Sequence, residues 1–125
     1  MGDPLTLSSF LNYGFDFFPA DSYSLILWDH GGGPVLGYGV DENFRDLLTL
    51  DELSEALEDS VGAHMTKLEW IGFDACLMSS LEVASVLAPY ANYMIASQET
   101  EPGWGWNYDF LSELSDEVIP GDVMG

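Results

Sequence analysis

Positive charge is nearly absent from this sequence, and its scarcity excludes several classes of protein. Only Arg45 and Lys67 are basic, against 22 acidic residues, so the formal net charge is -20 at pH 7. A chain this acidic repels phosphate backbones and anionic lipid surfaces, which excludes nucleic acid as a partner. Cationic partners such as basic peptides or calcium suit the charge, although most of the carboxylates are expected only to keep the surface soluble.

Cysteine and long apolar runs are also scarce. Cys76 is the only cysteine, so no disulfide can form within the chain and the lone thiol is a candidate for chemistry. No apolar run has the roughly 20 residues of a membrane-spanning helix. No signal-peptide pattern follows Met1, so the sequence leaves the cellular location open. Neither end carries an evident closing element, and we expect one partial domain over residues 1–125, truncated at both ends.

Helical and strand-like patterns alternate along the chain. Apolar spacing and cap residues predict helices, and short apolar runs predict buried strands. The expected elements are a helix from Asp3-Pro4 to Pro19, a strand over 23–28, a loop over 34–49, a helix over 51–61, a strand over 68–73, a helix capped by Ser79 or Ser80 and ending near Ala88, a strand over 92–97, a Trp- and Gly-rich loop over 98–107 and a short helix over 108–114. This order is typical of an α/β fold with a mainly parallel sheet flanked by helices.

Chemically active side chains follow the ends of the expected strands. His30 lies two residues beyond the first strand and Cys76 three beyond the second. The carboxyl ends of parallel strands share one edge of the sheet, where ligands usually bind. If the two strands are neighbours, a thiol and an imidazole therefore meet in one crevice. Glu101, Trp104 and Trp106 leave the third strand at the same edge and are expected to wall the crevice.

This set of groups has the parts of a cysteine nucleophile. The thiolate is the reactive form of Cys76, and a helix beginning just after it would favour the anion. His30 can take the proton and later return it to a leaving amine. The backbone N–H groups of Gly31 and Cys76 are candidates for an oxyanion hole. Each residue alone has an ordinary structural interpretation; their joint placement at strand ends favours catalysis.

Three motifs carry a resemblance to a known family. Residues 25–33 (LILWDHGGG) and 71–80 (IGFDACLMSS) resemble the two catalytic motifs of the clostripain family of cysteine peptidases, and 93–106 (YMIASQETEPGWGW) resembles its next block. The resemblance implies a three-layer caspase-like fold and a catalytic dyad of His30 and Cys76. Pro34 departs from the family, whose members tend to have Trp at this position, and this affects the expected loop geometry rather than the dyad.

The resemblance also implies a substrate class. Family members hydrolyse peptide bonds after Arg and sometimes Lys, through a covalent thioester acyl-enzyme. Asp74 matches the acidic residue of their specificity pocket, and a carboxylate two residues before the nucleophile can hold a cationic side chain. No cofactor is required for this chemistry. The resemblance allows calcium as an activator, although no compact calcium-loop pattern is present.

Other interpretations remain open from sequence alone. A Cys–His pair also serves acyl transferases. Trp104, Trp106 and Tyr108 could instead form an aromatic platform of a non-catalytic binding module. A metal site is a third alternative, although its spacing is unlike that of structural zinc sites. Its ligands would be Asp29, His30, Asp74 and Cys76. His64 is rejected as a competing base because it is expected at the opposite edge of the sheet.

Overall fold

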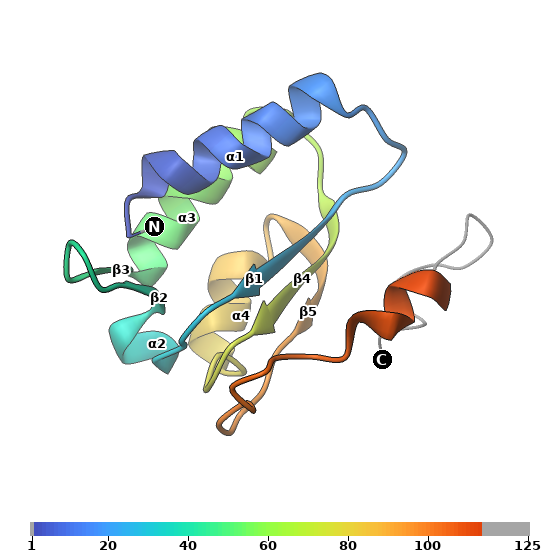
Figure 1. Ribbon diagram of the computed structural model, residues 1–125. Coiled ribbons are helices and arrows are strands. Elements are labelled where there is room, and N and C mark those ends of the chain that lie inside the picture. Colours follow the sequence, from blue (N-terminus) through green and yellow to red (C-terminus); the bar gives the residue numbers. More distant parts are fainter. Residues whose placement is uncertain (1, 114–125) are drawn as a thin grey trace.

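A three-stranded parallel sheet forms the centre of the structure, which is a computed structural model describing residues 2–113 (Figure 1). The strands are β1 (Ser24–Trp28), β4 (Leu68–Asp74) and β5 (Ala91–Ile95), in the spatial order β1-β4-β5. The register pairs Trp28 with Asp74, so β1 and β4 end at the same level. The expected strands are confirmed, and the two that precede His30 and Cys76 are direct parallel neighbours.

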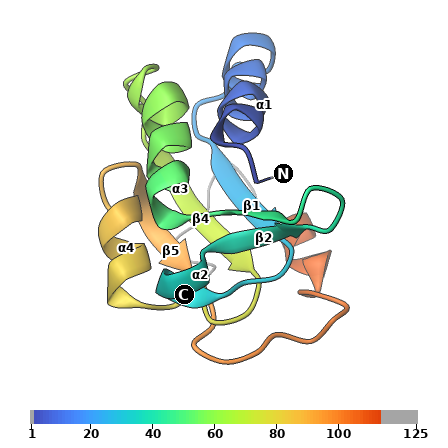
Figure 2. The same cartoon turned by 90° about the vertical axis from the view of Figure 1, so that its left-hand side faces the viewer.

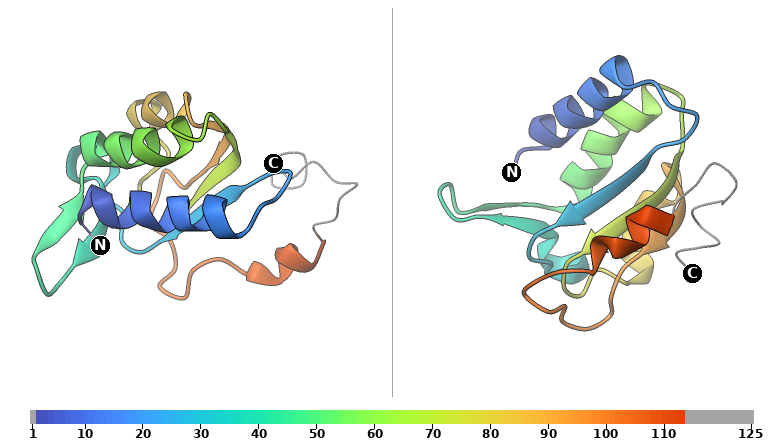
Figure 3. Two further views of the ribbon diagram at one scale, coloured as in Figure 1. Left: turned by 90° about the horizontal axis from the view of Figure 1, so that it is seen from above. Right: turned by 45° about the vertical axis from the view of Figure 1, so that its right-hand side comes forward.

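Three α-helices cover one face of this sheet. They are α1 (Pro4–Phe17), α3 (Leu50–Leu57) and α4 (Leu81–Leu87), which Figures 1 and 3 place on the same side of the strands. The core lies between these helices and the sheet, where Leu53, Phe73 and Val83 are completely buried. Because apolar burial is the main favourable term in folding, this interface holds the sheet and therefore the ends of its strands in place.

The opposite face is partly covered by the segment that follows β5, while Trp28 and Tyr93 on the outer strands stay exposed. Figure 3 shows this segment passing the carboxyl ends of the strands and ending in the 3₁₀ helix η2 (Tyr108–Glu113). A methyl group added to Gly72 of β4 would lie 2.8 Å from the Trp106 ring and 3.0 Å from the Trp70 ring. Gly72 therefore admits the Trp106 ring against the sheet. The α/β class with helices beside a mainly parallel sheet is confirmed.

The three longer helices begin at side-chain caps, of which Asp3 and Ser80 were predicted from the sequence and Thr49 was not. The Asp3 carboxylate accepts from the Leu5 N–H at 2.9 Å, directly before the first-turn proline of α1. Thr49 and Glu52 form a reciprocal capping box at the start of α3. The Ser80 hydroxyl accepts from the Val83 N–H at 3.2 Å and starts α4. α3 then continues into a π-helical turn, η1 (Glu58–Gly62), so the single helix expected over 51–61 changes its winding at the end.

The prediction of a long loop over 34–49 is wrong. The segment contains the short helix α2 (Gly33–Leu36) and an antiparallel hairpin of β2 (Tyr38–Asp41) and β3 (Asp46–Leu48), which lies near the N-terminal end of α1 (Figure 2). The Asp41 carboxylate organises the hairpin turn by accepting from the N–H groups of Asn43 and Phe44, each at 3.0 Å. Strands of three and four residues are too short to show a period of two in the sequence.

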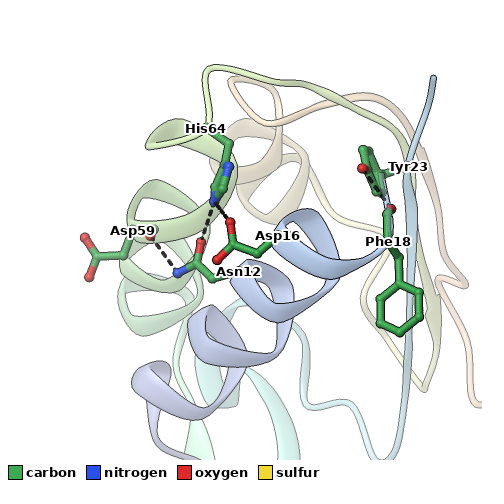
Figure 4. A network of polar contacts seen from close by, with 6 residues as sticks. All are labelled: Asn12, Asp16, Phe18, Tyr23, Asp59 and His64. Carbon is green, nitrogen blue, oxygen red and sulfur yellow. Dashed lines mark hydrogen bonds and ion pairs between the residues drawn. The ribbon is translucent and has the colours of Figure 1, made fainter. Parts of the chain in front are cut away.

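His64 lies in a polar network between α1 and the end of η1, as expected at the edge opposite the carboxyl ends of the strands (Figure 4). Its Nε2 lies 3.0 Å from Asn12 Oδ1 and 4.0 Å from Asp16 Oδ1, and Asn12 also donates to the Asp59 carbonyl at 3.3 Å. Nearby, the Tyr23 hydroxyl donates to the Phe18 carbonyl at 3.0 Å. The rejection of His64 as a base is therefore supported by its position.

His64→Ala is expected to lower the free energy of unfolding by about 0.5 to 1.5 kcal/mol, because it removes one hydrogen bond that joins α1 to η1. Urea denaturation would measure the change. Asn12→Ala should cost a similar amount, and the double variant should cost less than the sum because the two side chains share that bond. Strict additivity of the two losses would contradict the contact.

Within the part of the chain that the structure describes, no helix combines the length and apolar character needed to cross a membrane.

Candidate active site

The loops that follow β1 and β4 touch through their backbones. A methyl group on Gly31 would overlap the carbonyl oxygen of Cys76, and one on Gly33 would lie 3.1 Å from the carbonyl oxygen of Leu77. Glycine at these positions allows the two loops to approach more closely than side chains would permit. The predicted meeting of the His30 and Cys76 loops at one edge of the sheet is therefore confirmed.

A cavity of about 340 Å³ opens at this edge. Its volume falls in the usual range of small-molecule sites, roughly 300–1,000 Å³. The residues that line it are Trp28, Asp29, His30, Asp74, Ala75, Cys76, Glu101, Pro102 and Gly103. The thiol, the imidazole and the carboxylate that the sequence singled out thus share one cavity, and Cys76 is only partly buried there. The lining has three carboxylates and neither Lys nor Arg among the described residues.

The helix after Cys76 begins at the predicted Ser80 cap and not at Cys76 itself, so it does not favour the thiolate in the way considered from the sequence. Cys76 lies in a turn whose next residue, Leu77, has a positive φ of 63°, and α4 begins only at Leu81. The turn is held by the segment after β5: the Leu77 N–H donates to the Glu99 carbonyl at 3.0 Å, and the Ser79 N–H to the Ser97 carbonyl at 2.9 Å. Helix geometry therefore cannot supply stabilisation for the sulfur.

A backbone N–H group from another loop donates a hydrogen bond to the Cys76 sulfur instead. The Glu101 N–H donates to Cys76 Sγ at 3.2 Å. A hydrogen bond from an N–H group stabilises negative charge on the acceptor, as a helix N-terminus would. Sequence reasoning placed Glu101 at the crevice, which the structure confirms, but it missed this backbone contact, since nothing in the sequence shows which amide would reach the sulfur.

The His30 loop is anchored to the β2–β3 hairpin. The Asp29 carboxylate accepts from the backbone N–H groups of His30 and, at 3.3 Å, Val40. The Gly39 N–H donates to the His30 carbonyl at 2.8 Å. Asp29 thus serves to shape this loop, and the hairpin that the sequence failed to predict holds the backbone of His30.

Gly31 lies behind His30, outside the lining of the cavity. It faces Tyr38 in an isolated antiparallel bridge whose hydrogen bonds run through the flanking residues, from the Gly32 N–H to Gly37 at 2.9 Å and from the Gly39 N–H to His30. The Gly31 N–H is not used in this bridge. It remains a candidate donor for an oxyanion, with the Cys76 N–H as the second.

Asp74 is buried, with 2% of its surface exposed, although it lines the cavity. Its Oδ2 accepts from the Trp106 N–H at 2.8 Å and from the Tyr108 hydroxyl at 2.7 Å. Its Oδ1 is buried and has no hydrogen-bond partner among residues 2–113. A buried carboxylate oxygen without a donor is costly, and such an atom in a native site calls for a functional explanation.

The aromatic wall of the cavity differs from the expected one. Trp28, the last residue of β1, lines the cavity and is 64% exposed. Trp104 points to solvent with 86% exposure, and Trp106 packs on the sheet. The prediction that Trp104 and Trp106 wall the crevice is therefore wrong. The two rings also do not combine with Tyr108 into one exposed platform, which removes the basis of the binding-module alternative.

No group of three or more His, Cys, Asp or Glu side chains in the described part of the chain is arranged to hold a metal ion. Asp29, His30, Asp74 and Cys76 do line one cavity, but Asp29 and Asp74 are engaged with backbone and tyrosine donors. Neither the alternative metal site nor an activating calcium ion can be assigned to these residues.

Two tyrosines near the cavity are expected to titrate unusually late. Burial, then the hydrogen bond to Asp74, raise the pKa of Tyr108 to about 12. Burial, then the negative charge of Asp29, raise the pKa of Tyr38 even further. Because the pKa is higher in the folded state, the unfolded chain loses its tyrosine protons first as the pH rises. The contribution of these tyrosines to the free energy of unfolding is therefore full below pH 10 and is lost as the pH rises through 12.

Ultraviolet titration of phenolate absorbance would test this prediction. Of the six tyrosines, Tyr38 and Tyr108 should ionise last, and urea denaturation at a series of pH values above 10 should show a falling free energy of unfolding. In Tyr108→Phe, one of the late transitions should disappear. Simultaneous ionisation of all tyrosines near pH 10, in a protein still folded, would contradict the two environments.

Comparison with known proteins gives one consistent family. The model of the clostripain family matches residues 1–122. Clostripain from Hathewaya histolytica is 33% identical over an alignment 128 positions long, and the matched part is 87% of this chain and 23% of clostripain. The chain thus spans about a quarter of that relative's length.

Solved structures agree with the sequence match. A secreted C11 cysteine protease from Bacteroides thetaiotaomicron, solved with an irreversible peptide inhibitor, superposes with a TM-score of 0.83 at 28% identity, covering 98% of this chain and 35% of the protease. An inactive zymogen C11 protease from Parabacteroides distasonis gives a TM-score of 0.65 at 28% identity, covering 84% of this chain and 29% of the zymogen chain. The fold, the order of the motifs and the family model agree, and this chain belongs to the clostripain family of cysteine peptidases.

Proposed function

We propose that the protein containing this chain is a cysteine endopeptidase that cleaves peptide bonds after Arg or Lys, with Cys76 as nucleophile and His30 as base. The observation that carries the proposal is one cavity that joins a partly exposed thiol, an imidazole and a buried carboxylate with an unpartnered oxygen. The family's known members support hydrolysis. Because the chain spans a minor part of those members, activity belongs to the whole protein.

Acylation begins with proton transfer from the Cys76 thiol to the His30 imidazole. The thiolate attacks the scissile carbonyl carbon and forms a tetrahedral oxyanion, for which the Gly31 and Cys76 N–H groups are the proposed donors. Collapse of this intermediate breaks the C–N bond, and the imidazolium gives its proton to the leaving amine. The remaining acyl group is a thioester on Cys76.

Deacylation uses the same two side chains. His30 removes a proton from a water molecule, whose oxygen attacks the thioester carbonyl carbon. The second tetrahedral intermediate expels the Cys76 sulfur, the imidazolium proton returns to the sulfur, and the peptide leaves with a new carboxyl end. Only the peptide and water are consumed, so the proposed chemistry requires no cofactor.

Asp74 supplies the proposed selectivity for basic residues. A carboxylate whose Oδ1 is buried and unpartnered gains most from a ligand that brings both a positive charge and N–H donors. The guanidinium of Arg and the ammonium of Lys have both. Asp29 and Glu101 add negative charge to the lining, which attracts cationic peptides to the cavity.

Fluorogenic peptides that differ only in the residue before the cleaved bond would test the proposal. We expect turnover with Arg or Lys and much slower turnover with citrulline, which keeps the shape of Arg without its charge. If no metal ion takes part, a chelator should leave hydrolysis intact. If the chelator instead abolishes hydrolysis and added calcium restores it, calcium activates the protein through residues outside those described. Equal cleavage of the Arg and citrulline peptides would contradict the assigned selectivity.

A further inference from the structure

We infer that Tyr108 is a positioning residue for substrate selection: its hydroxyl holds one oxygen of Asp74, so that the other, which has no partner, is left to accept from the cation of the substrate. This inference rests on the proposed function and deepens it. Tyr108 does not line the cavity, and it acts only through Asp74. Its place in the sequence, 34 residues after Asp74, gives no indication of this contact.

The segment after β5 wraps the far side of the Asp74 carboxylate. The Trp106 N–H and the Tyr108 hydroxyl both donate to Oδ2, at 2.8 and 2.7 Å. Gly105 has a positive φ of 72°, and a methyl group there would lie 2.5 Å from Oδ2 and 2.8 Å from Trp28 Nε1. The backbone at Gly105 therefore passes directly against the Asp74 carboxylate and leaves no room for the carboxylate to rotate toward Gly105.

Two donors on one oxygen fix the orientation of the carboxylate. An oxygen that accepts two hydrogen bonds has used both of its lone pairs, so Oδ2 has little capacity left for a ligand. Oδ1 keeps its full capacity: it is buried, has no partner in the described chain and belongs to a residue that lines the cavity. A substrate cation that reaches Asp74 would therefore find free lone pairs only on Oδ1, and holding such a group in place is what positioning residues contribute to binding.

The Tyr108 hydroxyl is a dependable donor over the working pH range of proteins. Its raised pKa, about 12, means that it keeps its proton well above neutral pH. The hydroxyl of a tyrosine on a rigid ring is also better placed than a longer flexible side chain. Tyr108 lies 6.5 Å from the Trp106 ring and 6.0 Å from the Phe110 ring, measured between centroids, and these contacts limit its movement.

A purely structural role is the competing explanation. In that case Tyr108 would hold the segment on the sheet through its ring, and loss of the hydroxyl would affect every substrate equally or none. Tyr108→Phe separates the two explanations because it keeps the ring contacts and removes only the donor to Oδ2. Tyr13→Phe is the matched control, since it removes a hydroxyl from an exposed tyrosine on α1.

The experiment compares these variants in the whole protein. For Tyr108→Phe we expect kcat/KM for Arg and Lys peptides to fall about 10-fold, which is the order expected for a lost hydrogen bond to a charged group. The loss should lie mainly in KM, and the inhibition constant of benzamidine, a small cationic amidine, should rise by a similar factor. The alkylation rate of Cys76 by iodoacetamide, which needs no cation, should stay within about twofold of the wild type.

Each outcome decides the inference. A selective loss with Arg, Lys and benzamidine, at constant alkylation rate and with Tyr13→Phe unchanged, supports it. A change in kcat/KM below twofold overturns it, and so does a parallel loss of alkylation, which would indicate a structural role. If the wild type itself shows no preference for Arg or Lys over citrulline, the proposed selectivity fails and the inference fails with it.

Discussion

Replacement of Cys76 by alanine is expected to abolish peptide hydrolysis by the whole protein. The variant has no sulfur to form the thioester, and removal of the nucleophile from a comparable enzyme costs about 10⁴- to 10⁶-fold in kcat. The fold should persist, because Cys76 is only partly buried and alanine keeps the backbone contacts of its turn. Initial rates with an Arg peptide and thermal unfolding by circular dichroism would measure both properties.

His30→Ala should cause a loss of similar size, and the double variant should lose no more than either single one because the two groups act as a unit. His64→Ala is the matched control, since this second histidine lies in the network between α1 and η1 (Figure 4). Retained turnover in Cys76→Ala would refute the assigned nucleophile. Full activity in His30→Ala, or loss in His64→Ala, would refute the assigned base.

Asp74→Asn is expected to remove the preference for basic residues. It takes away the charge that would pair with the substrate cation in a buried position, which typically costs about 2 to 5 kcal/mol. That corresponds to a fall in kcat/KM of about 30- to 5,000-fold for Arg and Lys peptides. The citrulline peptide should be cleaved as well as before, because its urea group forms no ion pair.

Exposed Asp21, in the turn before β1, provides the matched control as Asp21→Asn. That variant changes the net charge by the same amount without touching the cavity, so it separates the buried carboxylate from the general attraction between an acidic protein and a basic peptide. If Asp74→Asn and Asp21→Asn lower the rates equally, or if the Arg-to-citrulline ratio survives in Asp74→Asn, Asp74 does not select the substrate.

Much of the fold could be predicted because its signals are local. Asp3 with Pro4, the Thr49–Glu52 pair and Ser80 satisfy the first N–H groups of their own helices, so the helix starts are encoded within a few residues. Strand β4 is mainly apolar, as a parallel strand covered on both faces must be, whereas β1 and β5 are partly exposed. The hairpin over 38–48 escaped prediction because its strands are short and its turn depends on the Asp41 side chain.

The candidate site was predicted only in part. The order of strands and helices along the sequence predicts a parallel sheet, and this topology places His30 and Cys76 at one edge. The structure confirms the prediction, because both residues line the same cavity. Helix α4 begins at Leu81 rather than directly after Cys76, and the donor to the Cys76 sulfur comes from Glu101, 25 residues later. The tryptophan that walls the cavity is Trp28 rather than those of the later loop, since side-chain direction at a strand end depends on the sheet register.

The sequence by itself determined the class of fold, the order of its elements and the two residues proposed for catalysis, because periodicity, caps and motif spacing are properties of short stretches of chain. Only the tertiary structure decided that Asp74 is buried with one oxygen held by Trp106 and Tyr108 and the other without a partner in the described chain. The physical reason is that hydrogen bonds between segments more than 30 residues apart depend on how a loop packs across the sheet, which no local pattern specifies.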